Sequence, residues 1–196
     1  MKKKNTIIYG GAFNPPTIVH EIILQSCVDY AATQDADVWV MPSGDRYDKC
    51  ISVCREQRIE FIDLMIRDTN IPDGVAVNVM TIELDRDHTV RTIDTVKELA
   101  ELYPNRSFIW VYGSDVTRAM IEWEGGEWLL KNLRMLVVER PGSMTNPLAK
   151  HVMKLDSPNS TISSSEVRRR LAVGESVDGL VSPAICYVIN KNTSPV

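Results

Sequence analysis

Residues 10–20 read GGAFNPPTIVH and follow directly after NTIIY at residues 5–9. The apolar, β-branched composition of NTIIY predicts a short buried strand. In the longer stretch the glycine pair permits close backbone approach by a ligand, and a proline suits the first turn of a helix. That helix would present unpaired N–H groups to an anion, with His20 in its first turns. The stretch predicts a strand, a ligand-binding loop and a helix, although the same residues could form only a glycine turn, a helix cap and an incidental histidine.

Strand-like and helix-like segments alternate along the chain. Apolar runs with the composition of strands occupy residues 6–10, 37–42, 75–84, 107–113 and 134–140. Apolar residues at helical spacing occupy residues 18–32, 54–69 and 89–104. Such alternation is typical of βαβ units. It predicts an α/β fold, with a doubly wound, mostly parallel sheet and helices on both faces.

The character of the chain changes near residue 141, beyond which turn-forming residues become frequent. A short strand and two short helices are expected there, at residues 151–155, 165–173 and 183–191. We expect a single domain over residues 1–196. Within it, residues 1–141 would form the α/β core, and residues 142–196 a small C-terminal helical appendage.

Composition narrows the class of protein. The 196 residues are 44% hydrophobic and 24% charged, which suits one well-buried core. The formal net charge of −4 argues against nucleic acid as a partner, because nucleic-acid binders usually carry a basic face. No apolar run approaches the roughly 18 residues that span a bilayer, and no signal stretch leads the chain. We expect a cytoplasmic protein with no membrane partner, whose phosphate binding is local.

The four cysteines are irregularly spaced, which is typical of a reduced chain and not of a disulfide framework. Three residues separate Cys50 from Cys54, and the chain has only three histidines. A tetrahedral zinc site is therefore poorly supported. The two thiols are better explained by the start of a helix, and no metal ligands are expected.

Two common phosphate-binding motifs are missing from residues 10–20. The stretch contains neither the G-x-G-x-x-G pattern of dinucleotide-binding proteins nor the G-K-[ST] of a P-loop. In an open parallel sheet, ligands bind outside the carboxyl ends of the strands, near the switch point of strand order. A different phosphate chemistry is therefore indicated after the first strand.

GGAFNPPTIVH resembles the G-G-x-F-[DN]-P-x-[HT]-x-G-H signature of the nucleotidylyltransferase superfamily. Thr17 stands in the position that takes histidine or threonine, and His20 stands in that of the last histidine. Val19 departs from the pattern, because the family usually has glycine there. Its branched side chain would fill space that glycine leaves open beside the nucleotide.

A second stretch, ISSSEVRRRL at residues 162–171, resembles the I-S-S-[ST]-x-[IV]-R signature of the same superfamily. Ser163 and Glu166 have capping-box spacing, which predicts a helix start. Arg168 lies in the first turns of that helix, where a guanidinium can bind a triphosphate through two hydrogen bonds. The two arginines that follow it are expected on a solvated face.

Smaller features between the two signatures resemble one branch, the bacterial nicotinate-nucleotide adenylyltransferases. VMPSGDRYDK resembles that family's exit from the second strand, TVRTIDTVKEL its S-x-T-[IV]-D-T-L segment and YGSDV its I-G-x-D exit. The closing LAVGESVDGLVSPAICYVI resembles the family's final segment, so the likeness spans nearly the whole chain. Asp115 could instead merely cap a helix, and Trp123 could be ordinary core packing.

The resemblance implies a Rossmann-like nucleotidylyltransferase fold and adenylyl transfer from ATP to nicotinate or nicotinamide mononucleotide in NAD biosynthesis. His20 would donate to the α-phosphate or the bridging oxygen, and Thr17 would add a hydroxyl donor. Arg168 and Lys49 would hold the β and γ phosphates, with Mg²⁺ shared among phosphate oxygens. The residues expected around ATP and the acceptor are Gly10, Gly11, Ala12, Phe13, Lys49, Thr92, Gly113, Asp115, Trp123, Ile162, Ser163 and Ser164.

Two alternatives stay open at this point. One is a related nucleotidylyltransferase with another phosphorylated acceptor, such as phosphopantetheine or a sugar phosphate. The other is a nucleotide-binding module without turnover, motivated by Val19 and by the depleted loop at Lys49. The sequence does not decide whether nicotinate mononucleotide or nicotinamide mononucleotide is the acceptor. It is also compatible with a homo-oligomer.

Overall fold

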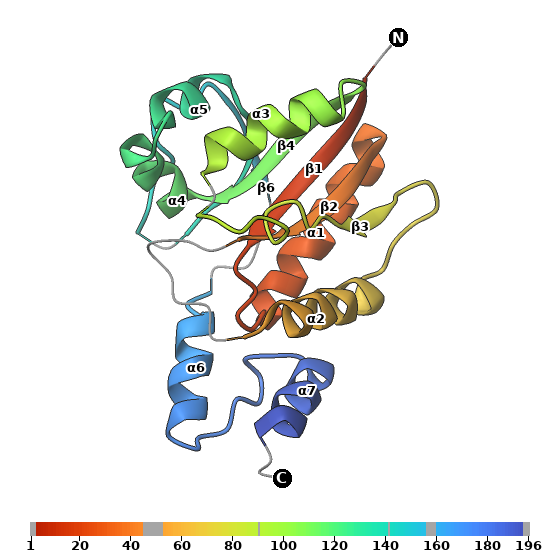
Figure 1. Cartoon of the computed structure of the whole chain (residues 1–196), viewed down its shortest axis with the longest axis vertical. Helices are drawn as coiled ribbons and strands as arrows, with labels where there is room; N and C mark the ends of the chain where they lie inside the picture. The colour runs from red at the N-terminus through yellow and green to blue at the C-terminus, as the bar shows by residue number, and fades with distance from the viewer. Residues whose placement is uncertain (1–2, 45–52, 90, 141, 156–159, 194–196) are drawn as a thin grey trace.

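A computed structural model of the chain describes residues 3–44, 53–89, 91–140, 142–155 and 160–193. Its centre is a six-stranded sheet in the order β3-β2-β1-β4-β5-β6, in which every pairing is parallel (Figure 1). The strands are β1 (Lys4–Gly11), β2 (Ala36–Pro42), β3 (Val77–Val79), β4 (Arg106–Gly113), β5 (Arg134–Val138) and β6 (His151–Leu155). Strand order reverses between β1 and β4, so the switch point lies at the end of β1. The predicted α/β class is confirmed.

Helices cover both faces of the sheet. They are α1 (Ile18–Gln34), α2 (Arg55–Asp68), α3 (Thr92–Leu102), α4 (Ser114–Ala119), α5 (Gly126–Asn132), α6 (Ser164–Ala172) and α7 (Pro183–Thr193), with a 3₁₀ turn η1 (Met120–Glu122). Alternate residues of β1 point to opposite faces: Ile7 packs with the side chains of α1 and α2, whereas Ile8 packs with those of α3 and α5. Both faces are therefore buried, which explains the continuous apolar runs of the strands.

The third strand is shorter than the predicted run of residues 75–84. β3 pairs only with β2 at the edge of the sheet, and the chain turns immediately after it. The N–H of Asp85 donates to the carbonyl of Thr81, and the Thr81 hydroxyl donates to the Asp85 carboxylate at 2.8 Å. This local turn satisfies the backbone that a longer strand would have needed to pair.

The helices between β4 and β5 were not predicted from the sequence. A glycine pair places α5 against η1: Gly125 has a φ of 70°, and a Cβ at Gly126 would lie 1.8 Å from the carbonyl oxygen of Met120. Only glycine permits that approach. The packing buries Leu129 and Leu130 completely on the sheet face.

The C-terminal segment completes both the sheet and the core. β6 pairs with β5, so the sheet extends beyond residue 141. Val167 of α6 and Ile185 of α7 are fully buried in the same cluster as α1 and α2. Figure 1 shows α6 and α7 together at the end of the molecule where the C-terminus lies. No helix within the described ranges is long and apolar enough to cross a membrane.

Candidate active site

A cavity of about 1070 Å³ opens at the carboxyl ends of β1 and β4, beside the start of α1 and α6. Its position agrees with the switch point of strand order. Most of the predicted site residues line it: Gly10, Gly11, Ala12, Phe13, His20, Thr92, Gly113, Asp115, Trp123, Ile162, Ser163, Ser164 and Arg168. Lys49 lies outside the described residues. Thr17 is described but does not line the cavity.

His20 is oriented by the residue that precedes α1. The backbone N–H of Thr17 donates to Nδ1 of His20 at 3.0 Å, and the Thr17 hydroxyl lies 2.8 Å from the same nitrogen. Because Nδ1 accepts, the neutral imidazole carries its proton on Nε2. The ring also packs edge-on against Phe13, with centroids 5.6 Å apart. Thr17 and Phe13 therefore hold the imidazole of His20, which lines the cavity.

Thr17 has a different place from the one expected. Its side chain is fully buried, and its hydroxyl is directed to His20. In this structure the Thr17 hydroxyl thus contacts His20 and does not line the cavity, which differs from the direct phosphate contact expected of it.

Two glycines of the lining lie close to side chains of the same wall. A Cβ at Gly11 would lie 3.0 Å from the ring of Phe13, and a Cβ at Gly113 would lie 2.3 Å from a carboxylate oxygen of Asp115. Phe13 itself has a φ of 45°, in the left-handed region that non-glycine residues rarely adopt. The loop after β1 therefore holds a specific backbone shape around the ring of Phe13.

The second signature closes over the first. Nη1 of Arg168 donates to the carbonyl of Asn14 at 2.8 Å, and Nη2 lies 3.2 Å from the Ser165 hydroxyl. The Ser164 hydroxyl donates to the carbonyl of Pro15 at 2.8 Å. These contacts fix the start of α6 against the loop after β1, so His20 and Arg168 line one cavity.

The predicted capping box at α6 forms only in part. The Ser163 hydroxyl accepts from the N–H of Glu166 at 3.3 Å, as expected of an N-cap. The Glu166 carboxylate, however, accepts from Arg169 and Arg170. These hydrogen bonds lower the pKa of Glu166 to about 2. Arg169 is half-exposed, in agreement with its predicted solvated face.

Asp115 and Trp123 both face the cavity. Gly113 is the N-cap of α4, so Asp115 does not cap that helix, and its side chain is exposed. Trp123 also packs against the core, and its ring meets Tyr112 edge-on at 6.4 Å. Tyr112 in turn stacks on Trp110 at 6.5 Å, which gives this wall an aromatic row.

Val19 is only 3% exposed and belongs to the core cluster, although it also lines the cavity. Its side chain therefore occupies mainly core space. The sequence pattern could not show this, because helical spacing does not tell how deeply the first turn of α1 sits.

Several further lining residues were not predicted, among them Ser43, Glu83 and Arg140. Ser43 follows β2, Arg140 follows β5, and Glu83 is buried with a hydrogen bond from the Thr95 hydroxyl at 2.8 Å. Arg140 is the last residue of the strand-like run predicted over residues 134–140. Glu83 was assigned to an extended strand, so its inward position depended on the turn after β3.

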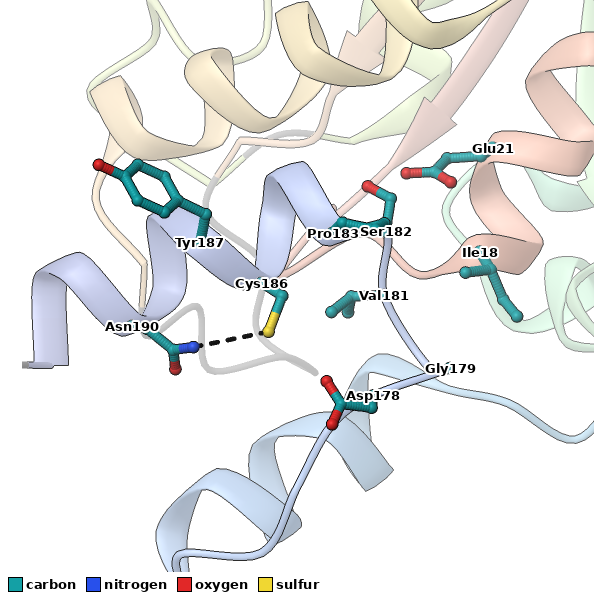
Figure 2. Close-up of a pocket in the computed structure, with 10 residues that line it drawn as sticks. All are labelled: Ile18, Glu21, Asp178, Gly179, Val181, Ser182, Pro183, Cys186, Tyr187 and Asn190. Carbon is teal, nitrogen blue, oxygen red and sulfur yellow. Dashed lines mark hydrogen bonds between the residues drawn. The ribbon is translucent and has the colours of Figure 1, made fainter.

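A second cavity, of about 680 Å³, lies on the other side of the first turn of α1. Figure 2 shows Glu21 facing Ser182 across it, with Asp178 and Asn190 on the side of the C-terminal segment. Burial raises the pKa of Glu21, and the nearby Ser182 hydroxyl lowers it by less. Among the residues that the structure describes, the lining contains no lysine, arginine or histidine. This cavity therefore suits phosphate poorly, and the site is assigned to the first.

Known proteins resemble this chain over most of its length. The cytidylyltransferase-like family model matches residues 8–170. A probable nicotinate-nucleotide adenylyltransferase of Exiguobacterium sibiricum is 30% identical over 186 residues, which cover 94% of this chain and 95% of that protein. One of Thermus thermophilus is 29% identical over 196 residues, covering 94% and 96%.

A solved structure extends the likeness to three dimensions. Plasmodium falciparum nicotinic acid mononucleotide adenylyltransferase, complexed with NaAD, superposes with a TM-score of 0.83 at 25% identity over 97% of each chain. The chain thus belongs to the cytidylyltransferase-like family and, within it, to the nicotinate-nucleotide adenylyltransferases.

Proposed function

We propose that this protein transfers the adenylyl group of ATP to nicotinate mononucleotide, releasing pyrophosphate and forming the dinucleotide of NAD biosynthesis. The observation that carries the proposal is the meeting of the two signatures: Arg168 contacts the loop after β1, and His20 faces the same cavity. The names of the relatives favour nicotinate mononucleotide as the acceptor. Nicotinamide mononucleotide differs only in its amide.

The chemistry needs no protein nucleophile. A 5′-phosphate oxygen of the mononucleotide forms a bond to the α-phosphorus of ATP, and the bond from that phosphorus to the bridging oxygen breaks. The electron pair leaves with pyrophosphate. Catalysis therefore consists of holding two anions in line and stabilising the charge that develops on the transferring group.

The described residues supply donors for this task. His20 would donate its Nε2–H to an α-phosphate oxygen, because Nδ1 is already an acceptor for Thr17. Arg168 would bind the β and γ phosphates, as a guanidinium suits paired oxygens. The start of α6 and the glycines at the end of β1 would add backbone N–H groups.

The site also suits Mg²⁺. That ion prefers one or two carboxylates together with substrate phosphates, and the exposed Asp115 carboxylate lines the cavity. Asp115 would hold the ion, and the ion would neutralise phosphate charge. Among the described residues, no three histidine, cysteine or acidic side chains gather into a metal-binding group, so the phosphates would supply the other ligands.

The acceptor ring would lie against the aromatic row of Trp110, Tyr112 and Trp123. A pyridine ring packs favourably on such edges and faces. Thr92 is the first residue of α3 and lines the cavity. The positive end of that helix favours a carboxylate, which supports nicotinate over nicotinamide as the better acceptor.

The test uses purified protein with ATP and Mg²⁺, supplied in parallel with nicotinate mononucleotide, nicotinamide mononucleotide and phosphopantetheine. Product mass identifies the acceptor. We expect the nicotinate dinucleotide to form fastest. If only phosphopantetheine gives a product, the proposed acceptor is wrong. If the protein binds ATP but forms no product with any acceptor, the proposed reaction is wrong.

A further inference from the structure

Arg58 is a buried cation that the mechanism above does not use. It lies in the first turn of α2, and only 3% of its side chain is exposed. Nε donates to the carbonyl of Ala12 at 2.9 Å, and Nη2 donates to the carbonyl of Ser43 at 2.5 Å. A buried guanidinium is costly unless its donors are engaged, so this arrangement is a specific one.

The two carbonyls belong to different loops of the active-site cavity. Ala12 follows β1 and Ser43 follows β2, and both residues line the cavity. The loops are also joined directly, because the N–H of Ser43 donates to the carbonyl of Gly11 at 2.8 Å. Arg58 therefore fixes both loops from behind, without itself lining the cavity.

The hydrogen bond from Arg58 to the Ala12 carbonyl also orients the N–H of the same peptide group, which belongs to Phe13. In a trans peptide the carbonyl and the N–H point in opposite directions, so an anchored Ala12 oxygen aims the Phe13 N–H away from Arg58. No hydrogen bond between the described residues uses that N–H. Ala12 and Phe13 both line the cavity, so the Phe13 N–H lies at the wall of the cavity.

We propose that Arg58 is a positioning residue for the phosphates of the nucleotide. It aims the Phe13 N–H at a phosphate oxygen and strengthens that donor by polarising the peptide between them. Chains of hydrogen bonds reinforce one another, and a charged donor at one end strengthens the effect. The inference rests on the proposed function, because it assumes that phosphates occupy this cavity.

Arg58→Met tests the proposal, and Arg106→Met is the matched control. Arg106 is a partly buried arginine, and its Nη1 donates to Thr6 and Asp37, each at 2.7 Å, near the starts of their strands. Lys4 still pairs with Asp37 in that control. Both substitutions remove an internal guanidinium, but only one removes the contact to the cavity loops.

Equilibrium titration with ATP and with adenosine separates the outcomes without needing turnover. We expect Arg58→Met to weaken ATP binding roughly 10- to 100-fold, the scale of a hydrogen bond to a charged group, and to leave adenosine binding nearly unchanged. Arg106→Met should lower the melting temperature and leave both affinities intact.

Equal losses for ATP and adenosine, or unchanged ATP binding, would overturn the proposal. If Arg58→Met does not fold, Arg58→Lys decides, because an ammonium can reach one carbonyl and should give an intermediate ATP affinity. If folded Arg58→Lys or Arg58→Met binds ATP as tightly as the wild type does, the role proposed for Arg58 is wrong. That result would not contradict the proposed adenylyl transfer. A wild-type protein that binds no ATP would overturn both.

Discussion

The Arg168 guanidinium donates to the carbonyl of Asn14 at 2.8 Å, across 154 positions of sequence. Beside it, the Ser164 hydroxyl donates to the carbonyl of Pro15. The two signatures thus contact each other directly through backbone oxygens of the loop after β1. The site is complete only when the C-terminal segment has packed on the sheet.

Replacing His20 with alanine tests the imidazole as a donor. We expect kcat to fall roughly 10²- to 10⁴-fold, the usual scale for a positioned donor in acid–base or electrostatic catalysis. The fold should persist, because His20 is only partly buried. Steady-state rates of pyrophosphate release measure the effect, with melting temperature as the control. Wild-type kcat in a folded variant would remove His20 from the mechanism.

Thr17→Val separates positioning from direct phosphate contact. It keeps the backbone donor to Nδ1 but removes the hydroxyl 2.8 Å from that nitrogen. We expect kcat to fall by about tenfold, the equivalent of one modest hydrogen bond, with the KM for ATP unchanged. Thr17→Ser should restore the rate. A raised KM with unchanged kcat would instead indicate direct contact with ATP.

Arg168→Gln tests the guanidinium at the start of α6. We expect roughly 10- to 100-fold weaker ATP binding, because a charged donor to phosphate is lost. Arg169→Gln is the matched control, since that neighbour is half-exposed and pairs with Glu166 and Glu175. Titration of each variant with ATP makes the comparison. Equal effects of both substitutions would point to general surface charge and not to a phosphate contact.

The pH dependence of stability should carry a contribution from Glu166. Its pKa falls from 4.5 to about 2 in the folded protein, so the folded state favours the ionised carboxylate. The stabilising contribution is present above about pH 4.5 and is lost as the pH falls toward 2. Melting temperatures of wild type and Glu166→Gln should therefore differ near neutral pH and converge at about pH 2. A gap that widens on acidification would contradict this.

The sequence predicted those elements whose formation depends mainly on residues close together in the chain. Examples are β1, the loop after it and the helix start at Ser163. Their residues have backbone preferences that affect only the neighbouring positions in the chain. The role of Thr17 was not predictable, because a threonine at a helix start can direct its hydroxyl to a ligand or to its own first turn. Only the fold shows that its side chain is fully buried.

Long-range contacts account for most of what the sequence left out. Arg58 sits in an amphipathic helix, and nothing in its spacing indicates that it reaches Ala12 and Ser43 in two other loops. Glu83 turns inward only because β3 ends at Val79. Such positions depend on the register of neighbouring strands, which periodicity does not fix.

Isotope transfer tests the central claim most directly. The protein is incubated with nicotinate mononucleotide, Mg²⁺ and ATP labelled in either the α or the γ phosphate. Adenylyl transfer predicts that the α label appears in the dinucleotide and the γ label in pyrophosphate, at equal rates. A γ label that appears on the mononucleotide would mean phosphoryl transfer instead, and it would contradict the in-line attack at the α-phosphorus that this site is proposed to support.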